Sequence, residues 1–172
     1  MTGLVDIHCH CLPGLDDGPA DMLSAIGLCR RLAEEGVGHV VATPHQLGRY
    51  EQQNNAAVVR DAVEALKGQL MAEGIGLEVS PGADVRVSDH LPALLEADEV
   101  MTIADGRQWM LAEMPDGAFL DLGPLLGRLL KSGVKAVITH PERYNWSDAA
   151  IGQMLRWRRG YGALVQITAG RC

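Results

Sequence analysis

Residues 4–19 read LVDIHCHCLPGLDDGP, an apolar segment that runs into histidines and then into a loop rich in Gly, Pro and Asp. The segment Leu4–His8 predicts a strand, and the loop leads into a helix over residues 21–35 that Gly36 ends. The same order recurs along the chain and predicts strands at 39–43, 77–80, 135–139 and 163–168 and helices at 55–72, 90–97, 122–132 and 148–159, the last capped by Asp148. Alternating strands and helices indicate an α/β fold with a parallel sheet, either doubly wound or a barrel.

One segment predicts a different connection. Met101–Ile103 and Gln108–Glu113 are two short apolar runs on either side of Asp105-Gly106. Asp-Gly between two such runs is typical of a β-hairpin, so we expect a hairpin here. The chain contains no linker and no low-complexity stretch, and we therefore expect residues 1–172 to form a single domain.

Composition excludes several classes of function. The formal net charge is −7 and no run of Lys or Arg occurs, which disfavours binding to nucleic acid. No apolar stretch approaches the length of a membrane span, and the first residues do not resemble a secretion signal. These observations predict a cytoplasmic protein without membrane insertion.

Polar residues that bind metals follow the predicted strands at the point where each strand ends. In a parallel α/β fold these ends meet at one edge of the sheet, where functional residues gather. Five successive strand ends carry such residues, namely His8 and His10, His45, Asp84, Glu113 and His140. Four of the six histidines of the chain belong to this set.

These residue types favour metal chemistry. Neutral imidazole binds borderline divalent ions and carboxylates bind harder ions or bridge two of them. His8 and His10 alternate with Cys9 and Cys11, so the histidines share one face of the strand and the cysteines fill the other. His39 opens a strand and His90 starts a helix, and we interpret both as packing residues.

Two residues in loops have competing interpretations. Asp17 in the Asp-Asp-Gly-Pro loop could serve only the turn or cap the next helix, but the loop leaves the strand of His8, which favours a metal ligand. Arg143 could form a surface ion pair with Glu142. Its position three residues after His140 favours bidentate binding of a phosphate group, as a catalytic and substrate-binding residue.

These residues, in this order, resemble the polymerase-and-histidinol-phosphatase (PHP) family of metal-dependent phosphoesterases. Within that family the chain is similar to the bacterial tyrosine-protein phosphatases found with capsular and exopolysaccharide synthesis genes. The resemblance covers essentially the whole chain, through Asp6-Ile-His-Cys-His10, Asp16-Asp-Gly-Pro19, Thr43-Pro-His45, Gly82-Ala-Asp84, Glu113, His140-Pro-Glu-Arg-Tyr144 and Gln166-Ile-Thr-Ala-Gly170.

The resemblance implies a distorted (β/α)₇ barrel with up to three ions, usually manganese, with iron or zinc as alternatives. It implies that His8, His10 and Asp84 hold the first ion, that Asp84, Glu113 and His140 hold the second, and that Asp17 and His45 hold the third. Arg143 would orient the phosphate. The implied reaction is hydrolysis of protein phosphotyrosine, with a bacterial tyrosine autokinase of polysaccharide synthesis as substrate.

The chain departs from the family pattern at two points. The family has Glu where this chain has Asp84, and it has a later Asp-x-His and a last strand, whereas this chain ends at Arg171-Cys172. We therefore expect the chain to be a C-terminally truncated member of the family with impaired activity. We also expect that it could form homo-oligomers. The alternatives are a PHP phosphatase of small phosphomonoesters such as histidinol phosphate and a metal-binding interaction module without catalysis.

Overall fold

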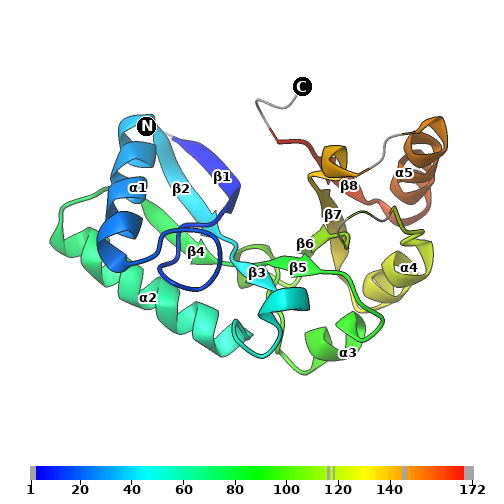
Figure 1. The fold of residues 1–172 in the computed structure, drawn as a ribbon, viewed down its shortest axis with the longest axis horizontal. Helices are drawn as coiled ribbons and strands as arrows, with labels where there is room; N and C mark the ends of the chain where they lie inside the picture. Colours follow the sequence, from blue (N-terminus) through cyan, green and yellow to red (C-terminus); the bar gives the residue numbers. More distant parts are fainter. Residues whose placement is uncertain (1–2, 116, 118, 145–146, 169–172) are drawn as a thin grey trace.

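The computed structural model describes residues 3–115, 117, 119–144 and 147–168. It is an α/β structure, as predicted, and every described strand pairing is parallel (Figure 1). The strands are β1 Leu4–Cys9, β2 Val37–Ala42, β3 His45–Gln46, β4 Glu78–Pro81, β5 Asp84–Arg86, β6 Trp109–Glu113, β7 Lys135–Thr139 and β8 Leu164–Gln166. The helices are α1 Met22–Glu34, α2 Ala56–Ala72, α3 Leu91–Glu96, α4 Gly123–Lys131 and α5 Asp148–Tyr161, with 3₁₀ turns η1 Gly48–Tyr50, η2 Ile103–Asp105 and η3 Pro141–Arg143.

Two breaks divide the strands into two sheets. The sheets have the orders β1-β2-β4 and β3-β5-β6-β7-β8, and β3 and β5 follow β2 and β4 after only two residues each. The break after β2 contains Pro44, which has no N–H to donate but accepts a 3.1 Å hydrogen bond from the backbone N–H of Asp84. The break after β4 contains Gly82, where a Cβ would lie 2.7 Å from Cγ1 of Val41. The strands of the two sheets therefore follow one continuous parallel order, and the sheet bends between β2 and β3.

Side-chain caps set the starts of three helices. The carboxylate of Asp21 accepts a hydrogen bond from the N–H of Ser24 at the start of α1, and the amide oxygen of Asn55 accepts one from Val58 at the start of α2. For α5 the cap is the hydroxyl of Ser147, which accepts from the N–H of Ala150. The prediction that Asp148 caps α5 was wrong, because Ser147 has the extended backbone of a cap and Asp148 already lies within the helix.

Apolar faces of the helices cover the strands and form the core. Figure 1 shows α1 and α2 beside the sheet of β1, β2 and β4, and α4 and α5 beside β7 and β8. The apolar face of α2 is buried through Val59, Val63, Leu66 and Leu70. This packing fixes the strands whose ends carry the predicted ligands.

The hairpin predicted around Asp105-Gly106 was wrong. Residues 101–102 are not in a strand. The 3₁₀ turn η2, with positive φ at Ala104 and Asp105, lies where the hairpin turn was predicted. The strand β6 pairs in parallel with β5 on one side and β7 on the other. Both edges of its ladder are thus occupied, so an antiparallel neighbour has no free edge to pair with.

The other predicted elements are present with ends within two residues of the predicted ones, and the short strands β3 and β5 were not predicted. Among the described residues, β1 and β8 stand at the two ends of the strand order, each with one strand neighbour. No described helix is long and apolar enough to cross a membrane. The α/β class with parallel strands is therefore confirmed, whereas closure into a barrel and a single domain over 1–172 stay predictions.

We expect truncation of Leu66 to Ala in α2 to lower the free energy of unfolding by about 2–5 kcal/mol, because the side chain is fully buried and its removal leaves a cavity. Leu23→Ala on α1 is the matched control, since that leucine is 80% exposed. Urea unfolding followed by circular dichroism measures both. Equal losses in the two variants would contradict the assignment of α2 to the core.

Candidate metal centre

All seven residues predicted as metal ligands converge in the structure. They lie at the ends of β1, β6 and β7, at the starts of β3 and β5, and in the loop after β1. Their ligand atoms form three overlapping groups in which the atoms lie within 4.8 Å of one another: His8, Asp84 and His140; His10, Asp17 and His45; and His45, Asp84 and Glu113.

Asp84 is the centre of the cluster. Its side chain is fully buried, and Oδ2 lies 3.2 Å from Nε2 of His140, 3.5 Å from Nε2 of His8 and 3.6 Å from Nδ1 of His45. Oδ1 accepts a 2.9 Å hydrogen bond from the hydroxyl of Thr139 on β7. Burial alone would raise the pKa of Asp84, but its hydrogen bonds and charge interactions with His140 and His8 outweigh burial and hold the pKa far below its usual value. The carboxylate is therefore ionised at neutral pH.

His8 and His10 project from the same side of β1, as the alternation predicted. Their Nε2 atoms lie 3.4 Å apart, while Cys11 is buried in the core and Cys9 packs against it. The other ring nitrogen of His8 lies 2.6 Å from Oε1 of Gln166 on β8, which fixes the orientation of the ring. Burial lowers the pKa of His8, but the interaction with Asp84 outweighs it and leaves the pKa above its usual value.

Asp16, which the sequence analysis did not select, anchors the loop after β1. Its Oδ2 lies 2.5 Å from Nδ1 of His10 and accepts a 2.9 Å hydrogen bond from the N–H of His45, and its Oδ1 accepts one from Gly18. Burial would raise the pKa of Asp16, but the interaction with His10 and these backbone bonds outweigh it and lower the pKa. Asp17 is instead 59% exposed, with Oδ1 3.7 Å from Nδ1 of His10 and 3.8 Å from Nε2 of His45. The first aspartate thus orients two histidines, and the second remains available as a ligand.

The loop reaches the cluster because of Gly18. A Cβ at that position would lie 2.5 Å from the carbonyl oxygen of His10, so only glycine allows this approach. The Asp-x-Gly spacing is the one signal in the sequence that could have identified Asp16, because a carboxylate two residues before a glycine commonly closes such a turn.

Glu113 at the end of β6 is held by Arg86, a second residue that the sequence analysis missed. Nε of Arg86 lies 2.9 Å from Oε2 of Glu113, and Oε2 is 3.5 Å from Nδ1 of His45. Burial and the charge of Asp84 raise the pKa of Glu113, while Arg86 lowers it in part. Arg86 follows Asp84 by two residues on β5, so both side chains lie on the same face of that strand.

The donor set fits divalent metal ions. Two ligands bound to one ion at about 2.1 Å lie roughly 3.0–3.4 Å apart. The nitrogen–oxygen distances around Asp84, from 3.2 to 3.6 Å, are close to that spacing, and those to His8 and His45 exceed the usual length of a hydrogen bond. Nδ1 of His45 is buried, has no hydrogen-bond partner among the described residues, and faces the carboxylates of Asp84 and Glu113. An ion between these three residues would satisfy that nitrogen.

His140 occupies a strained backbone conformation. Its φ of 32° lies in the left-handed region, and it precedes Pro141, which ordinarily favours an extended backbone in the residue before it. Such strain persists where the surrounding structure imposes it, and it is frequent at functional sites. The turn directs His140 toward Asp84 and places Arg143 three residues later beside the cluster.

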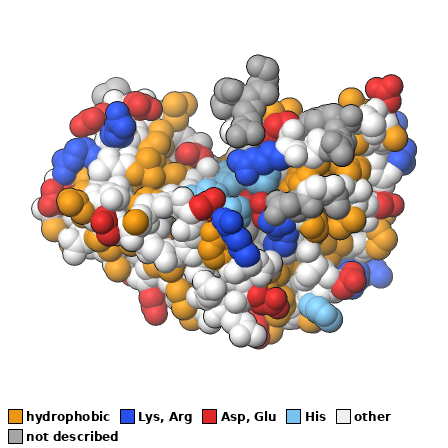
Figure 2. All heavy atoms as spheres, in the orientation of Figure 1, with side chains coloured by type: hydrophobic (Ala, Val, Ile, Leu, Met, Phe, Trp, Pro, Cys, Tyr) orange, Lys and Arg blue, Asp and Glu red, His pale blue; other side chains and the backbone are white. Residues whose placement is uncertain are grey.

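Arg143 lies at a small pocket over the cluster. Figure 2 shows Lys and Arg side chains gathered around the histidines in the middle of this face. The pocket has a volume of about 140 Å³ and is lined by Asp17, His45, Leu47, Arg49, Tyr50, Arg86, Glu113 and Arg143. Glu142 accepts a hydrogen bond from the N–H of Thr168, and no described contact pairs it with Arg143. Arg143 therefore lines the pocket, and its role in binding phosphate stays a prediction.

The two histidines interpreted as packing residues lie outside the cluster. Nε2 of His39 lies 2.8 Å from the hydroxyl of Ser80, and His90 is exposed before α3. Of the sequence block 166–170, residues 169 and 170 lie outside the described residues.

The fold and the cluster together define an α/β protein with a candidate metal centre at the ends of parallel strands. The chain belongs to the family described as capsular polysaccharide synthesis, CpsB/CapC, whose profile matches residues 4–171.

Individual relatives agree with this assignment. Tyrosine-protein phosphatase YwqE of Bacillus subtilis is 34% identical over 169 residues, and CapC of Staphylococcus aureus is 31% identical over 167 residues. The match covers 97% and 96% of this chain but 65% and 64% of those relatives, so the chain spans about two thirds of their length.

A solved structure extends the likeness to the fold. The chain superposes with a TM-score of 0.86 and 31% identity on a chain from the crystal structures of YwqE from Bacillus subtilis and CpsB from Streptococcus pneumoniae, described as unique metal-dependent tyrosine phosphatases. The match covers 97% of this chain and 67% of that one.

We expect the purified chain to bind divalent transition metal and His45→Ala to lose at least one equivalent, because His45 belongs to two of the three ligand groups. Metal analysis after dialysis, with isothermal titration of Mn²⁺ and Zn²⁺, measures this. The exposed His90→Ala is the control and should keep wild-type stoichiometry. Equal metal content in wild type and His45→Ala would remove His45 from the centre.

We expect Asp16→Asn to weaken metal binding by about 10- to 100-fold while leaving the number of sites unchanged, since residues that orient ligands have effects of this size. The reason is that Asp16 holds His10 and the backbone of His45 without being in a ligand group. The same titration gives both the affinity and the number of sites. A loss of sites in this variant would instead make Asp16 a ligand.

Proposed function

We propose that this chain carries the site of a metal-dependent phosphatase that hydrolyses phosphomonoesters, with protein phosphotyrosine as substrate and with a role in capsular or exopolysaccharide synthesis. The observation that carries the proposal is the placement of Arg143 in one pocket with His45, Asp17 and Glu113. A guanidinium directly beside a candidate metal centre suits the binding of a phosphate dianion. The names of the relatives support tyrosine phosphate as its source.

We propose that the ligands divide among up to three ions, of which manganese is the first candidate and iron or zinc are alternatives. His8, His10 and Asp84 would hold one ion, Asp84, Glu113 and His140 a second, and Asp17 and His45 a third. Divalent ions bound there would supply Lewis acidity and lower the pKa of coordinated water toward neutrality. Asp84 could serve two ions, because its ionised carboxylate has ring nitrogens of His8, His45 and His140 within 3.6 Å of Oδ2.

The residues of the chain bind and orient the substrate. Arg143 would hold the phosphate through a bidentate contact, while Arg86 would keep Glu113 in place and add positive charge to the pocket. Cys11 is disfavoured as a nucleophile. Contacts with the thiols of Cys29 and Cys9, together with burial, raise the pKa of Cys11, so this thiol stays protonated in the core.

We also propose that the strand order forms most of a distorted seven-stranded barrel within one domain over 1–172. The supporting observation is that the strands at both ends expose apolar side chains, with Leu4 69% and Val5 61% exposed on β1 and Leu164 and Val165 each 40% exposed on β8. A further strand between β8 and β1 would cover these edges, which otherwise favour association with another chain or a homo-oligomer.

The proposed partner is a phosphotyrosine protein, namely a bacterial tyrosine autokinase of polysaccharide synthesis, and the proposed location is the cytoplasm. The family description supports a partner from capsule synthesis. The experiment is an assay of the Mn²⁺-loaded chain on a phosphotyrosine peptide, a phosphoserine peptide and histidinol phosphate. Hydrolysis of histidinol phosphate alone would make the chain a small-molecule phosphatase, and metal binding without any hydrolysis would indicate an interaction module.

We expect Arg143→Ala to lower kcat/KM on p-nitrophenyl phosphate and on a phosphotyrosine peptide about 10²-fold, a typical loss for one electrostatic donor at a reacting group. Metal content should not change, because Arg143 binds phosphate and not the ion. Arg128→Ala is the matched control, since Arg128 is exposed and pairs with Asp89. Unchanged kcat/KM in Arg143→Ala would place the arginine outside the substrate site.

A further inference from the structure

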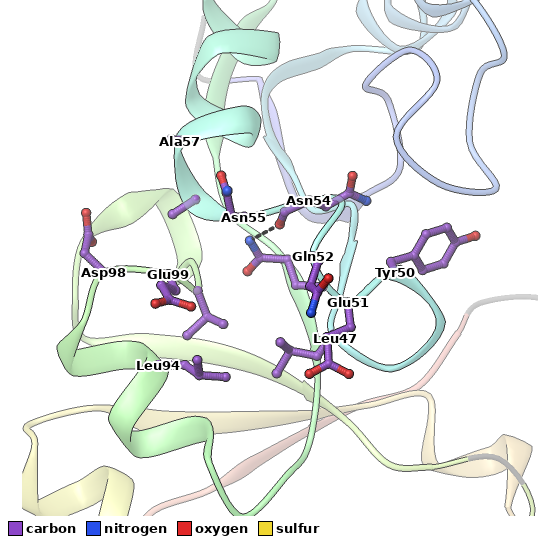
Figure 3. A pocket seen from close by; sticks show the side chains of 13 residues that line it. Leu47, Tyr50, Glu51, Gln52, Asn54, Asn55, Ala57, Leu94, Asp98 and Glu99 are labelled. Atoms are coloured by element: carbon purple, nitrogen blue, oxygen red, sulfur yellow. Dashed lines mark hydrogen bonds between the residues drawn. The ribbon is translucent and has the colours of Figure 1, made fainter.

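A larger cavity lies directly beside the metal pocket. It has a volume of about 610 Å³ and is bounded by the segment after β3, the first turn of α2 and the segment that follows α3. Leu47 and Tyr50 line both this cavity and the metal pocket, so one layer of side chains separates the two. Figure 3 shows Tyr50 pointing away from Leu94 and Glu99, with Leu47 nearer to the cavity.

The wall of the cavity is held in place by buried amides. The side chain of Gln46 donates a 2.5 Å hydrogen bond to the carbonyl oxygen of Asn54, shown as the dashed line in Figure 3, and accepts one from the N–H of Met101. The side chain of Asn54 donates to the carbonyl oxygens of Leu15 and of His45. Because these bonds are made within the protein, the cavity is formed before any ligand arrives, and its wall is tied to the backbone of a candidate metal ligand.

Tyr50 links the cavity wall to the cluster. Its ring stacks on the ring of His45 with centroids 5.8 Å apart and planes 9° apart, and the guanidinium of Arg49 lies 4.7 Å above it. A polypeptide that reaches from the metal pocket into the cavity would therefore pass an aromatic ring that contacts both His45 and Arg49.

The charged side chains that line the two spaces differ, because three arginines outnumber Asp17 and Glu113 in the metal pocket and the charged residues of the cavity are all acidic. Arg49, Arg86 and Arg143 line the metal pocket, whereas no Lys or Arg lines the cavity, whose acidic residues are Glu51, Asp98 and Glu99. Asp98 is neutralised by salt bridges with Arg60 and Arg107. Glu51 and Glu99 have no ion-pair partner among the described residues, and Figure 3 shows them on opposite sides of the cavity.

We propose that this cavity is a substrate subsite that binds the polypeptide flanking the phosphotyrosine and prefers a Lys or Arg side chain there. The proposal rests on the proposed function, since the metal pocket must take the phosphate. It identifies the substrate as a phosphoprotein with a basic residue close to the tyrosine, because two unpaired carboxylates attract a cation that the arginines of the neighbouring pocket would repel. A small phosphomonoester would fill the metal pocket alone and leave the cavity unused.

The test compares two phosphotyrosine peptides that differ only in carrying Lys or Glu on both sides of the phosphotyrosine. In the Mn²⁺-loaded chain we expect kcat/KM for the Lys peptide to exceed that for the Glu peptide roughly fivefold at low salt, the scale of one or two exposed ion pairs. The double variant Glu51→Gln/Glu99→Gln should remove this preference. It should leave p-nitrophenyl phosphate hydrolysis unchanged, since neither residue lines the metal pocket.

The matched control is Glu34→Gln, an exposed glutamate on α1, which should keep the preference. A second measurement uses the same peptides with a non-hydrolysable difluorophosphonate in place of the phosphate and follows binding by fluorescence anisotropy. Equal values for both peptides in turnover and binding, or a preference for the Glu peptide, would overturn the subsite. A preference for Lys in binding without turnover of any substrate would support the subsite and overturn the proposed phosphatase.

Discussion

The structure depends on one buried charge, the carboxylate of Asp84. A carboxylate in the interior is strongly destabilising unless hydrogen bonds and opposite charges compensate for lost hydration. Compensation comes from Thr139 on β7, from His140 just after it and from His8 on β1, residues far apart in the sequence. The ends of these strands must therefore meet at one point, and the same contacts that stabilise the charge assemble the candidate metal centre.

The breaks in the strands make that meeting possible. If β2 continued without interruption into β3, residue 45 would stay in the first sheet, but the break at residues 43–44 carries His45 into the second sheet opposite Asp84. The break at residues 82–83 does the same for β5, which brings Asp84 and Arg86 onto one short strand. Short, irregular strands are thus the structural source of the overlap between the three ligand groups.

Electrostatics then divides the surface around the centre. The chain has a net charge of −7, yet three arginines line the pocket over the ligands. Their positive charge offsets Asp17 and Glu113 and favours an anion in the pocket where divalent ions would also bind one. The neighbouring cavity, like the whole chain, has more acidic than basic residues. A substrate with an anionic group beside a cationic group would complement the charges of the pocket and of the cavity. The net charge of the chain alone does not indicate this.

The sequence by itself determined the parallel α/β class and the seven candidate ligands, because strand–helix alternation is local and the ends of parallel strands must share an edge. Alternation along β1 likewise separated His8 and His10 from the cysteines. Only the tertiary structure decided the contacts of Asp16 and Arg86, the bend between β2 and β3, and the absence of the hairpin at residues 105–106. Each of these depends on which strand or loop lies alongside, and a local pattern carries no information about neighbours that the chain reaches only after folding.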